Sequence, residues 1–458
     1  MDSSRTTTPG QGLTAFHWEV QPAAGTLVHD LLSDLTARSP TASRWAERLL
    51  NETGTRLIDW IDHLEVADAP GLDGRLRSAG FHAEAVDGLL VFRHPGGLFP
   101  AVVLTANGSH GLHLRVESVV DALQALELSV PIAGAPWAGL RRACIADESA
   151  QVWLCERHGY QGFDLPTLVP ERLMALLRHN DAFLTRRRAF DRPEDGFAYA
   201  LTLVDAAVRD LGMDLACDRF FAAERAYWQR RNRAARVQKA RQDALGLGWA
   251  NHDHHTYRSS RAHFPAMIAV FERLGFLCRE RFYPGHNAGW GAQVLEHAGT
   301  GIVIFADVDM SEDEIKRDFA HHAFPDEAGR PLGTVGLWCA LHGESFLEAG
   351  MHHLEATFSF EHVRAQLEQL GVHSMPPFTD YPHLRQCFTV GDRWSVTPSR
   401  IDRLLAATLI TSAQAEQFRK EGAIGSHLEL LERNQGFKGF NQDGVDRIIA
   451  GTDPRAQH

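Results

Sequence analysis

The order of strand and helix patterns constrains the fold of this chain more than any other feature. A strand–helix–strand–strand–strand order occurs twice within residues 55–164, and the second copy begins at the strand pattern of residues 111–116. The order resumes after residue 248, where a third unit has a helical pattern at 264–275, and a fourth unit extends from 351 to 432. We therefore predict an α+β fold of four βαβββ modules in two pairs.

Residues 165–246 interrupt this order with long apolar-periodic stretches and few turn signals, which predicts a helical insertion between the pairs. The basic end of the insertion, 225–241, is expected to bridge the two halves, because charge runs on helices usually face solvent or connect units. Three other parts are expected: a helical or flexible segment at 1–54, a non-catalytic pair of βαβββ modules at 55–164, and a metal-binding, catalytic pair of modules at 247–458.

Composition excludes several classes of protein. The 458 residues carry a formal net charge of −12 and are 44% hydrophobic, which fits a globular protein and not a basic nucleic-acid binder. The six cysteines form no CxxC pair, so neither a zinc finger nor a secreted disulfide framework is expected. No apolar run approaches the length of a membrane span, and the polar N-terminus lacks a signal core. We expect a cytoplasmic protein without nucleic-acid or membrane partners, and leave a homodimer open.

Three short strings late in the chain predict a metal site. Alternate residues of a strand share a face, so His254 lies on the same face as Thr256 and Arg258, and Glu429 lies opposite the leucines that flank it. The candidate ligands are His254, His353 and Glu429, each from a different strand. Two imidazoles and one carboxylate leave three coordination positions free, the arrangement of non-haem Fe(II) oxygenases. Four neighbouring side chains are rival ligands: His252, His255, His352 and Glu432.

These strings resemble those of the vicinal oxygen chelate superfamily. Asp253-His254, His352-His353-Leu354 and Leu428 to Arg433, followed by Gln435-Gly436-Phe437, are similar to the metal-binding strings of 4-hydroxyphenylpyruvate dioxygenases. His254-His-Thr-Tyr-Arg258 is similar to the His-x-x-x-Arg string of the 2-oxoadipate dioxygenase/decarboxylase family, in which the histidine binds iron and the arginine holds a substrate carboxylate. The chain departs from the first family at 415–420, where a polar string replaces an apolar strand, so the substrate stays open.

The resemblance implies an Fe(II) dioxygenase that uses His254, His353 and Glu429 to hold the iron, with a 2-oxo acid chelated beside a position for O2. The implied reaction is oxidative decarboxylation, which gives CO2 and, from a 2-oxoadipate-like substrate, a 2-hydroxy acid. Arg258 lies roughly 13 Å along the strand from His254. Its guanidinium fork suits a second substrate carboxylate, and pairing with a surface acid is the alternative. Phe437 and Phe440 are expected to bind substrate as part of a lid that excludes water, or else to be core residues.

Three other functions remain open on the same residues. The first is a 4-hydroxyphenylpyruvate dioxygenase-like enzyme that acts on an aromatic 2-oxo acid. The second is a non-redox lyase or isomerase that uses Zn or Ni, and the third is a metal-free binding protein. Oxygen uptake separates the first from the second, and metal analysis identifies the third.

The N-terminal half offers His63 and His113 at matching strand positions. Aligning the Glu-Arg pairs that end the two halves puts Trp153 where Glu429 stands. Because an indole cannot ligate a metal, we predict that this half has lost a ligand and is metal-poor. A second metal site that uses Glu156 is the alternative.

Overall fold

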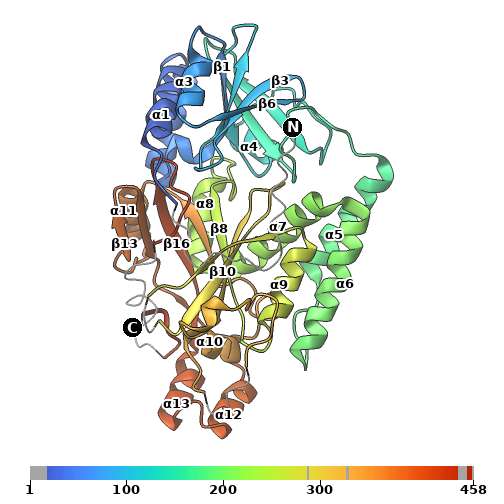
Figure 1. Cartoon of the computed structure of the whole chain (residues 1–458), viewed down its shortest axis with the longest axis vertical. Helices are drawn as coiled ribbons and strands as arrows, with labels where there is room; N and C mark the ends of the chain where they lie inside the picture. The colour runs from blue at the N-terminus through green and yellow to red at the C-terminus, as the bar shows by residue number, and fades with distance from the viewer. Residues whose placement is uncertain (1–17, 286–287, 326–329, 442–450, 456–458) are drawn as a thin grey trace.

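The computed structural model describes residues 18–285, 288–325, 330–441 and 451–455. It contains two β-sheets, one in each half of the chain, with helices packed on them and between them (Figure 1). The predicted α+β class is therefore confirmed. Within the described ranges, no helix combines the length and the apolar character that crossing a membrane requires.

The C-terminal sheet consists of two modules that meet at a central antiparallel pair of strands. The strand order is β13-β14-β16-β12-β8-β11-β10-β9, with β15 paired to β16. The strands β8 and β12 are antiparallel, whereas each pairs in parallel with the last strand of its own module, β11 or β16. With a helix after each central strand, the result is two βαβββ units. Their elements are β8 (His252–Arg258), α9 (Phe264–Arg273), β9 (Leu277–Phe282), β10 (Trp290–Glu296), β11 (Val303–Asp309), β12 (His353–Thr357), α11 (Phe360–Gln369), β13 (Thr379–Tyr381), β14 (Leu384–Phe388), β15 (Asp392–Trp394) and β16 (Ala423–Arg433).

The N-terminal sheet repeats this plan, but one of its modules is incomplete. The strand order is β2-β3-β4-β1-β5-β7-β6, with β1 and β5 antiparallel at the centre. The second module has only three strands, and the strand expected before β6 is reduced to an isolated bridge between Ala133 and Arg142. The elements are β1 (Ile61–Ala67), α3 (Leu72–Ser78), β2 (His82–Val86), β3 (Leu89–Arg93), β4 (Ala101–Thr105), β5 (Gly111–Arg115), α4 (Val119–Ala125), β6 (Leu140–Ala146) and β7 (Gln151–Arg157).

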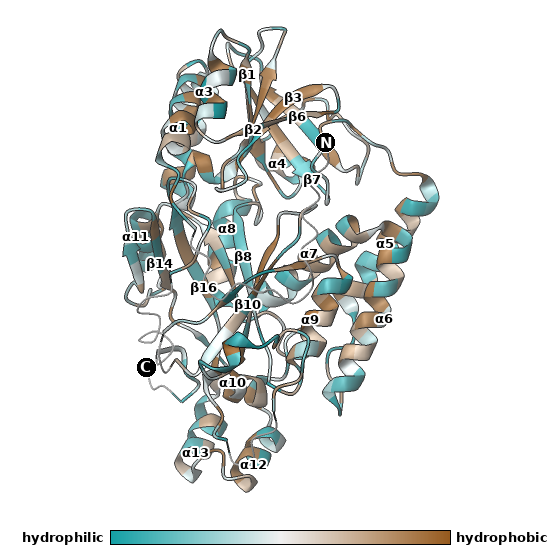
Figure 2. Cartoon of the chain, in the orientation of Figure 1, coloured by the Kyte–Doolittle hydropathy of each residue, from teal (hydrophilic) through white to brown (hydrophobic). Residues whose placement is uncertain are grey.

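Helices outside the modules cover the sheets and join the halves. The N-terminal helices pack on the first sheet, four consecutive helices follow β7, and three more lie in the C-terminal half (Figure 1). The last of the four, α8, is mostly hydrophilic (Figure 2). It nevertheless bridges the halves, because Gln238 donates to the backbone of Thr53 at 2.9 Å. The bounds are α1 (Pro22–Ala37), α2 (Pro40–Arg48), α5 (Pro170–Thr185), α6 (Pro193–Leu211), α7 (Met213–Arg230), α8 (Arg233–Asp243), α10 (Thr334–His342), α12 (Pro398–Ala406) and α13 (Ser412–Glu421), with short helical turns at Leu49–Thr53, Leu57–Trp60 and Glu314–Lys316.

Burial of leucines fixes which way the second sheet presents its polar residues. Leu354 of β12 and Leu428 and Leu430 of β16 are fully buried in a core that also contains residues of α7 and α9. Burying one leucine stabilises a fold by roughly 1.5–3 kcal/mol, and a one-residue slip in register would expose all of them. Because neighbours in a strand alternate, the residues between these leucines face the opposite side of the sheet.

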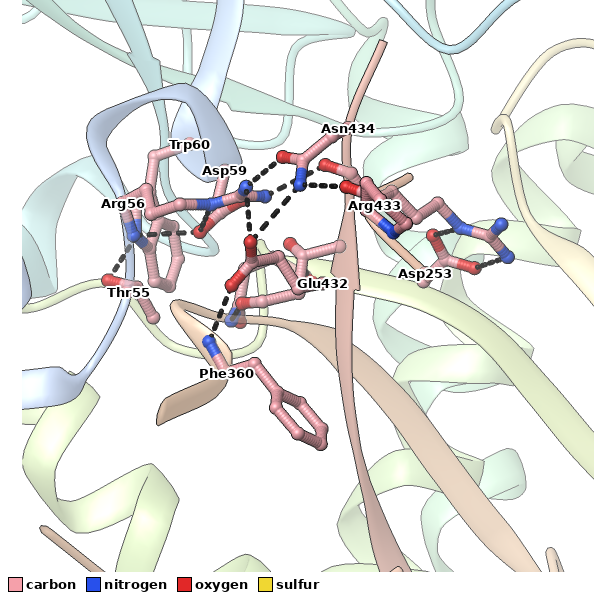
Figure 3. A network of polar contacts seen from close by, with 12 residues as sticks. Thr55, Arg56, Asp59, Trp60, Asp253, Phe360, Glu432, Arg433 and Asn434 are labelled. Carbon is pink, nitrogen blue, oxygen red and sulfur yellow. Dashed lines mark hydrogen bonds and ion pairs between the residues drawn. The ribbon is translucent and has the colours of Figure 1, made fainter. Parts of the chain in front are cut away.

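A polar network joins the halves at the end of β16 (Figure 3). Arg56, which precedes β1, pairs with Asp59 at 2.6 Å and also donates to the side chain of Asn434 at 2.7 Å and to the backbone of Arg433 at 3.1 Å. Glu432 accepts from the first backbone N–H of α11 at 2.7 Å and lies 3.7 Å from Arg56. The end of the last strand is therefore held by both halves.

Candidate metal centre

Four ionisable side chains meet on the polar face of three adjacent strands of the second sheet. His254 comes from β8, His353 and Glu355 come from β12, and Glu429 comes from β16, and all four are buried. The register sets Glu355 directly beside Glu429 across the parallel β12–β16 pair. The structure thus brings together the three candidate ligands proposed from the sequence and adds a fourth residue, Glu355.

The spacing of the donor atoms suits one cation. His254 Nε2 lies 3.0 Å from Glu355 Oε1, and His353 Nε2 lies 2.6 Å from the same oxygen and 3.5 Å from Glu429 Oε2. His254, Glu355 and Glu429 each offer one ligand atom within 4.8 Å of the others. Two neighbouring ligands with bonds of about 2.1 Å lie about 3 Å apart. His254, Glu355 and Glu429 thus have the spacing of ligands to one ion, and His353 lies outside that group but next to both carboxylates.

Glu355 was missed from the sequence, although a signal was present. It lies two residues after His353 on the same strand, so both side chains share a face. If Glu355 joins the other three residues as a ligand, an octahedral ion keeps two open positions instead of three. Thr256 donates to Glu355 Oε1 at 2.7 Å, while Oε2 has no hydrogen-bond partner among the described residues.

Outer residues orient the ligands. Asp253 accepts from Nδ1 of His254 at 2.8 Å, and Arg433 in turn donates to Asp253 at 2.8 Å (Figure 3). A histidine that uses Nδ1–H in this way turns its Nε2 lone pair toward the cavity. Gln386 donates to Glu429 at 2.8 Å and fixes the second carboxylate in the same manner.

The electrostatics of the cluster favour exchange of protons for a cation. Burial opposes protonation of His254, but the Glu355 and Asp253 carboxylates outweigh it and raise its pKa to about 10. Burial also opposes protonation of His353, whose pKa is raised to about 9 by Glu355 and Glu429. The pKa of Glu429 is raised by burial and by the charge of Glu355. A divalent ion can replace the two imidazolium charges and leave the carboxylates paired.

The four rival ligands lie elsewhere. His255 packs against Phe221 in the core beneath the sheet, and its ring contacts that of His252 at 5.1 Å. His352 packs edge-on against Trp338 at 5.2 Å, next to His353 but outside the cavity. Glu432 bonds the first turn of α11, as described above. None of the four lines the cavity that the ligand cluster faces.

This cavity has about 550 Å³ of space, including its open mouth, and the apolar part of its wall is aromatic. Besides the four ionisable residues it is lined by Thr256, Arg258, Phe282, Trp290, Phe305, Asp307, Phe378, Gln386, Phe388, Phe440, Asn441 and Thr452. An aromatic wall excludes water and strengthens every polar interaction inside it. The site is therefore built for one small molecule with a few polar groups.

Arg258 reaches this cavity, as the strand pattern predicts. It is buried, and its only charged partner among the described residues is Asp307, with Nε and Oδ2 3.5 Å apart. Its Nη1 has no hydrogen-bond partner in the described chain. Burial raises the pKa of Asp307 to about 7 although Arg258 acts in the opposite direction. Arg258 therefore meets a buried acid and not a surface acid, and it keeps donor capacity free.

The two phenylalanines of the expected lid have different positions. The Phe440 ring lies 4.9 Å from the His254 ring and 5.0 Å from the Phe305 ring, inside the cavity wall. Phe437 does not line the cavity: it packs in a separate cluster with Leu384, Leu431 and residues of the N-terminal segment. Of the two residues, only Phe440 lies in the cavity wall, and Phe437 packs in the separate cluster.

The N-terminal half has the same strand arrangement and the same Arg–Asp–His contacts, but different side chains at the other ligand positions. Arg157 donates to Asp62 at 2.7 Å and Asp62 contacts Nδ1 of His63 at 2.7 Å, which repeats the Arg433–Asp253–His254 arrangement. The register pairs His113 with Trp153, whereas Glu355 pairs with Glu429. His113 thus corresponds to Glu355 and not to His353.

Ring stacking makes a metal in this half unfavourable. The rings of His63 and His113 stack 3.8 Å apart at 20°, and Trp153 stacks on the other side of His113. A ligand histidine holds its metal in the plane of the ring, so two nearly parallel stacked rings cannot share one ion well. Cys155 completes a group with these two histidines whose ligand atoms lie within 4.8 Å of one another.

Glu156, the alternative ligand, points away from this group. It accepts from the backbone N–H of Val119 at 2.8 Å, at the start of α4, and from His158 at 2.7 Å. Arg141 lies 3.1 Å from the same carboxylate. Glu156 thus caps a helix in its module, as Glu432 does in the other half.

Comparison with known proteins yields only distant likenesses. No protein-family model matches this chain, and no curated protein matches it. Among solved structures, a protein from Shewanella frigidimarina is 16% identical over 48% of this chain and 95% of its own, with a TM-score of 0.32. A variant of 4-hydroxymandelate synthase from Streptomyces coelicolor is 15% identical over 86% of this chain and 97% of its own, with a TM-score of 0.28. Methylmalonyl-CoA epimerase from Mycobacterium tuberculosis is 13% identical over 40% and 88%, with a TM-score of 0.23. TM-scores of this size leave family and activity open.

Proposed function

We propose that this protein is an Fe(II)-dependent dioxygenase that oxidatively decarboxylates a 2-oxo acid with a second carboxylate, a substrate like 2-oxoadipate. The observation that carries the proposal is the presence of a buried arginine with free donor capacity in the same cavity as the two histidines and Glu429. A charged guanidinium is costly to bury without an anion to meet it. The overall reaction consumes one O2 and gives one CO2 and a 2-hydroxy acid that is one carbon shorter.

Different residues of the cavity would bind the metal, bind the substrate and exclude water. His254, His353 and Glu429 would hold the ion, which when bound supplies the redox chemistry that activates dioxygen. Arg258 would bind the distal carboxylate and so orient the 2-oxo end toward the ligand cluster. Phe282, Phe305 and Phe440 would keep water out of the reaction space.

An aromatic 2-oxo acid is a weaker fit to this cavity. Phe378, Phe388 and Phe440 could stack on such a substrate, but Arg258 would then have Asp307, 3.5 Å away, as its charged partner and would leave Nη1 without an acceptor. A metal-free binding protein would gain nothing from four ionisable groups directed at one point.

One observation favours a second candidate, a non-redox metal lyase or isomerase. Glu355 supplies a second carboxylate at ligand distance, which leaves an ion with fewer open positions for both a chelating substrate and O2. In that case a redox-inactive ion would act as a Lewis acid.

Oxygen consumption separates these functions. Protein loaded with Fe(II) should consume O2 and release CO2 in equal amounts with 2-oxoadipate, and should do neither with the metal removed. Turnover of a substrate under nitrogen, without O2 uptake, would support the lyase or isomerase. Uptake with 4-hydroxyphenylpyruvate alone would support the aromatic substrate.

A further inference from the structure

A second, larger cavity lies between the two halves of the molecule and is lined by more cationic than anionic side chains. It has about 2320 Å³ of space and is open to solvent. Five arginines and three aspartates contribute to its wall: Arg56, Arg93, Arg115, Arg157, Arg433, Asp59, Asp62 and Asp253. This cavity is separate from the one that the metal ligands face, and nothing in the proposed function uses it.

All three aspartates in this wall already have an arginine partner. Arg56 pairs with Asp59 at 2.6 Å, as Figure 3 shows, and Arg157 pairs with Asp62 at 2.7 Å. Arg433 pairs with Asp253 at 2.8 Å. A fourth arginine, Arg93, pairs with Glu84 outside the cavity. The wall therefore has no carboxylate left for its fifth arginine.

That fifth arginine is Arg115, the last residue of β5. It is half-buried, and its side chain makes no hydrogen bond and no ion pair with the described part of the chain, although the charges of Asp62 and Asp218 act on it from farther away. Arg115 also lines a small neighbouring recess together with Arg157, Arg225 and His252. The nearby Asp218 is held by Arg219 at 2.6 Å and by His158 at 3.3 Å.

His252 adds a free donor or acceptor to the same recess. Its Nδ1 is buried and has no hydrogen-bond partner among the described residues. An imidazole that carries its proton on Nδ1 can donate a hydrogen bond from this atom to an anion.

We propose that the cavity between the halves binds a small oxyanion, a carboxylate or phosphate group, through the guanidinium of Arg115. An arginine fork matches the geometry of both groups, and an unpaired guanidinium in a cleft of excess positive charge attracts either one. His252 supplies a further contact. Anion binding at this site needs no metal, so the result of its test does not depend on whether the protein is a dioxygenase.

Isothermal titration calorimetry on the metal-free full chain tests this proposal, with inorganic phosphate and succinate as separate probes in a low-salt chloride buffer. We expect saturable binding of at least one anion, and the tighter one identifies the kind of group the site prefers. Arg115→Gln should weaken that binding by about tenfold or more, because a charge-assisted bidentate contact is lost. Arg115→Lys keeps the charge without the fork and should give an intermediate affinity.

Arg75→Gln provides the matched control. Arg75 is an exposed arginine of α3 in the same half, and it does not line the cavity. This variant should bind the anion as tightly as the unmodified protein. Absence of saturable binding of both anions to the unmodified protein would overturn the proposal. Equal affinity in the Arg115→Gln and Arg75→Gln variants would overturn it as well. Circular dichroism checks that each variant is folded. If Arg115→Gln does not fold, the affinity of Arg115→Lys for the anion is compared with that of Arg75→Gln instead.

Discussion

Arg433 donates a hydrogen bond to Asp253 at 2.8 Å, and this contact ties the last strand of the sheet to the residue that orients His254. The equivalent pair in the N-terminal half, Arg157 and Asp62, has the same geometry beside His63. The half with stacked histidines therefore retains the orienting frame. Both halves therefore share the Arg–Asp pair beside a histidine. The other side chains on the same strands decide what each half can bind.

This pairing gives a first prediction. Asp253→Asn should weaken Fe(II) binding by about 10 to 100-fold, because the amide no longer holds His254 in its ligating orientation. Asp62→Asn is the matched control, since it breaks the same contact in the other half and should leave the iron affinity unchanged. Metal titration of both variants measures the difference. An equal loss in both would mean that the effect comes from general destabilisation.

The ligand set itself gives a second prediction. The unmodified protein should bind one Fe(II) per chain, and His254→Ala, His353→Ala and Glu429→Ala should each lose it while remaining folded. His322→Ala, which removes an exposed histidine, should keep it. Elemental analysis gives the stoichiometry. Full iron occupancy in any of the three variants would remove that residue from the ligand set.

Glu355 needs its own variant. Glu355→Gln keeps the shape of the side chain and removes its charge. If three ligands suffice, this variant should retain one iron per chain with oxygen uptake still measurable. Loss of the iron would make Glu355 a required ligand and would favour the non-redox candidate.

Arg258 gives a prediction about substrate choice. Arg258→Lys should lower kcat/KM with 2-oxoadipate by about 10²-fold, because the lysine keeps a charge but loses the fork that positions the substrate. Activity with 4-hydroxyphenylpyruvate should change little. Oxygen-electrode rates with both acids provide the measurement. Activity confined to the aromatic acid, and unaffected by the substitution, would reject the distal carboxylate.

Asp307 predicts how substrate binding varies with pH. Burial raises its pKa to about 7, above the ordinary carboxyl value, so folding disfavours its charged form. The contribution of Asp307 to the free energy of unfolding should therefore fall as pH rises from about 4 toward 7, so the difference in this free energy between the unmodified protein and Asp307→Asn should fall over the same range. Above the transition the Asp307 carboxylate competes for Arg258, so KM for a dicarboxylate should rise with pH. A KM profile that is identical in Asp307→Asn would contradict this role.

The N-terminal half gives the last prediction. Removing His63 and His113 together with alanine substitutions should leave the iron stoichiometry unchanged, because stacked rings cannot share an ion well. Native mass spectrometry of the loaded protein should find a single metal ion. Two ions per chain, falling to one in the double variant, would contradict the prediction.

Much of this arrangement follows from the sequence because strands alternate. The alternation around Leu428 and Leu430 was enough to aim Glu429 away from the core, and it placed Arg258 on the face of His254. The same rule places Glu355 on the face of His353, because the two residues are two positions apart in β12. The position of Phe437 and the pairing of Arg258 with Asp307 depend on turns and on contacts between distant strands. Local patterns carry no information about these.

The order in which the chain supplies its ligands has a consequence for synthesis. His254, His353 and Glu355 are all in place before residue 356, whereas Glu429 lies on β16, which the helices α12 and α13 separate from the rest of its module. A chain still leaving the ribosome holds an incomplete donor set until that strand inserts beside β12. Iron uptake would then mark the end of folding, and chains that lack the last strand would remain free of iron.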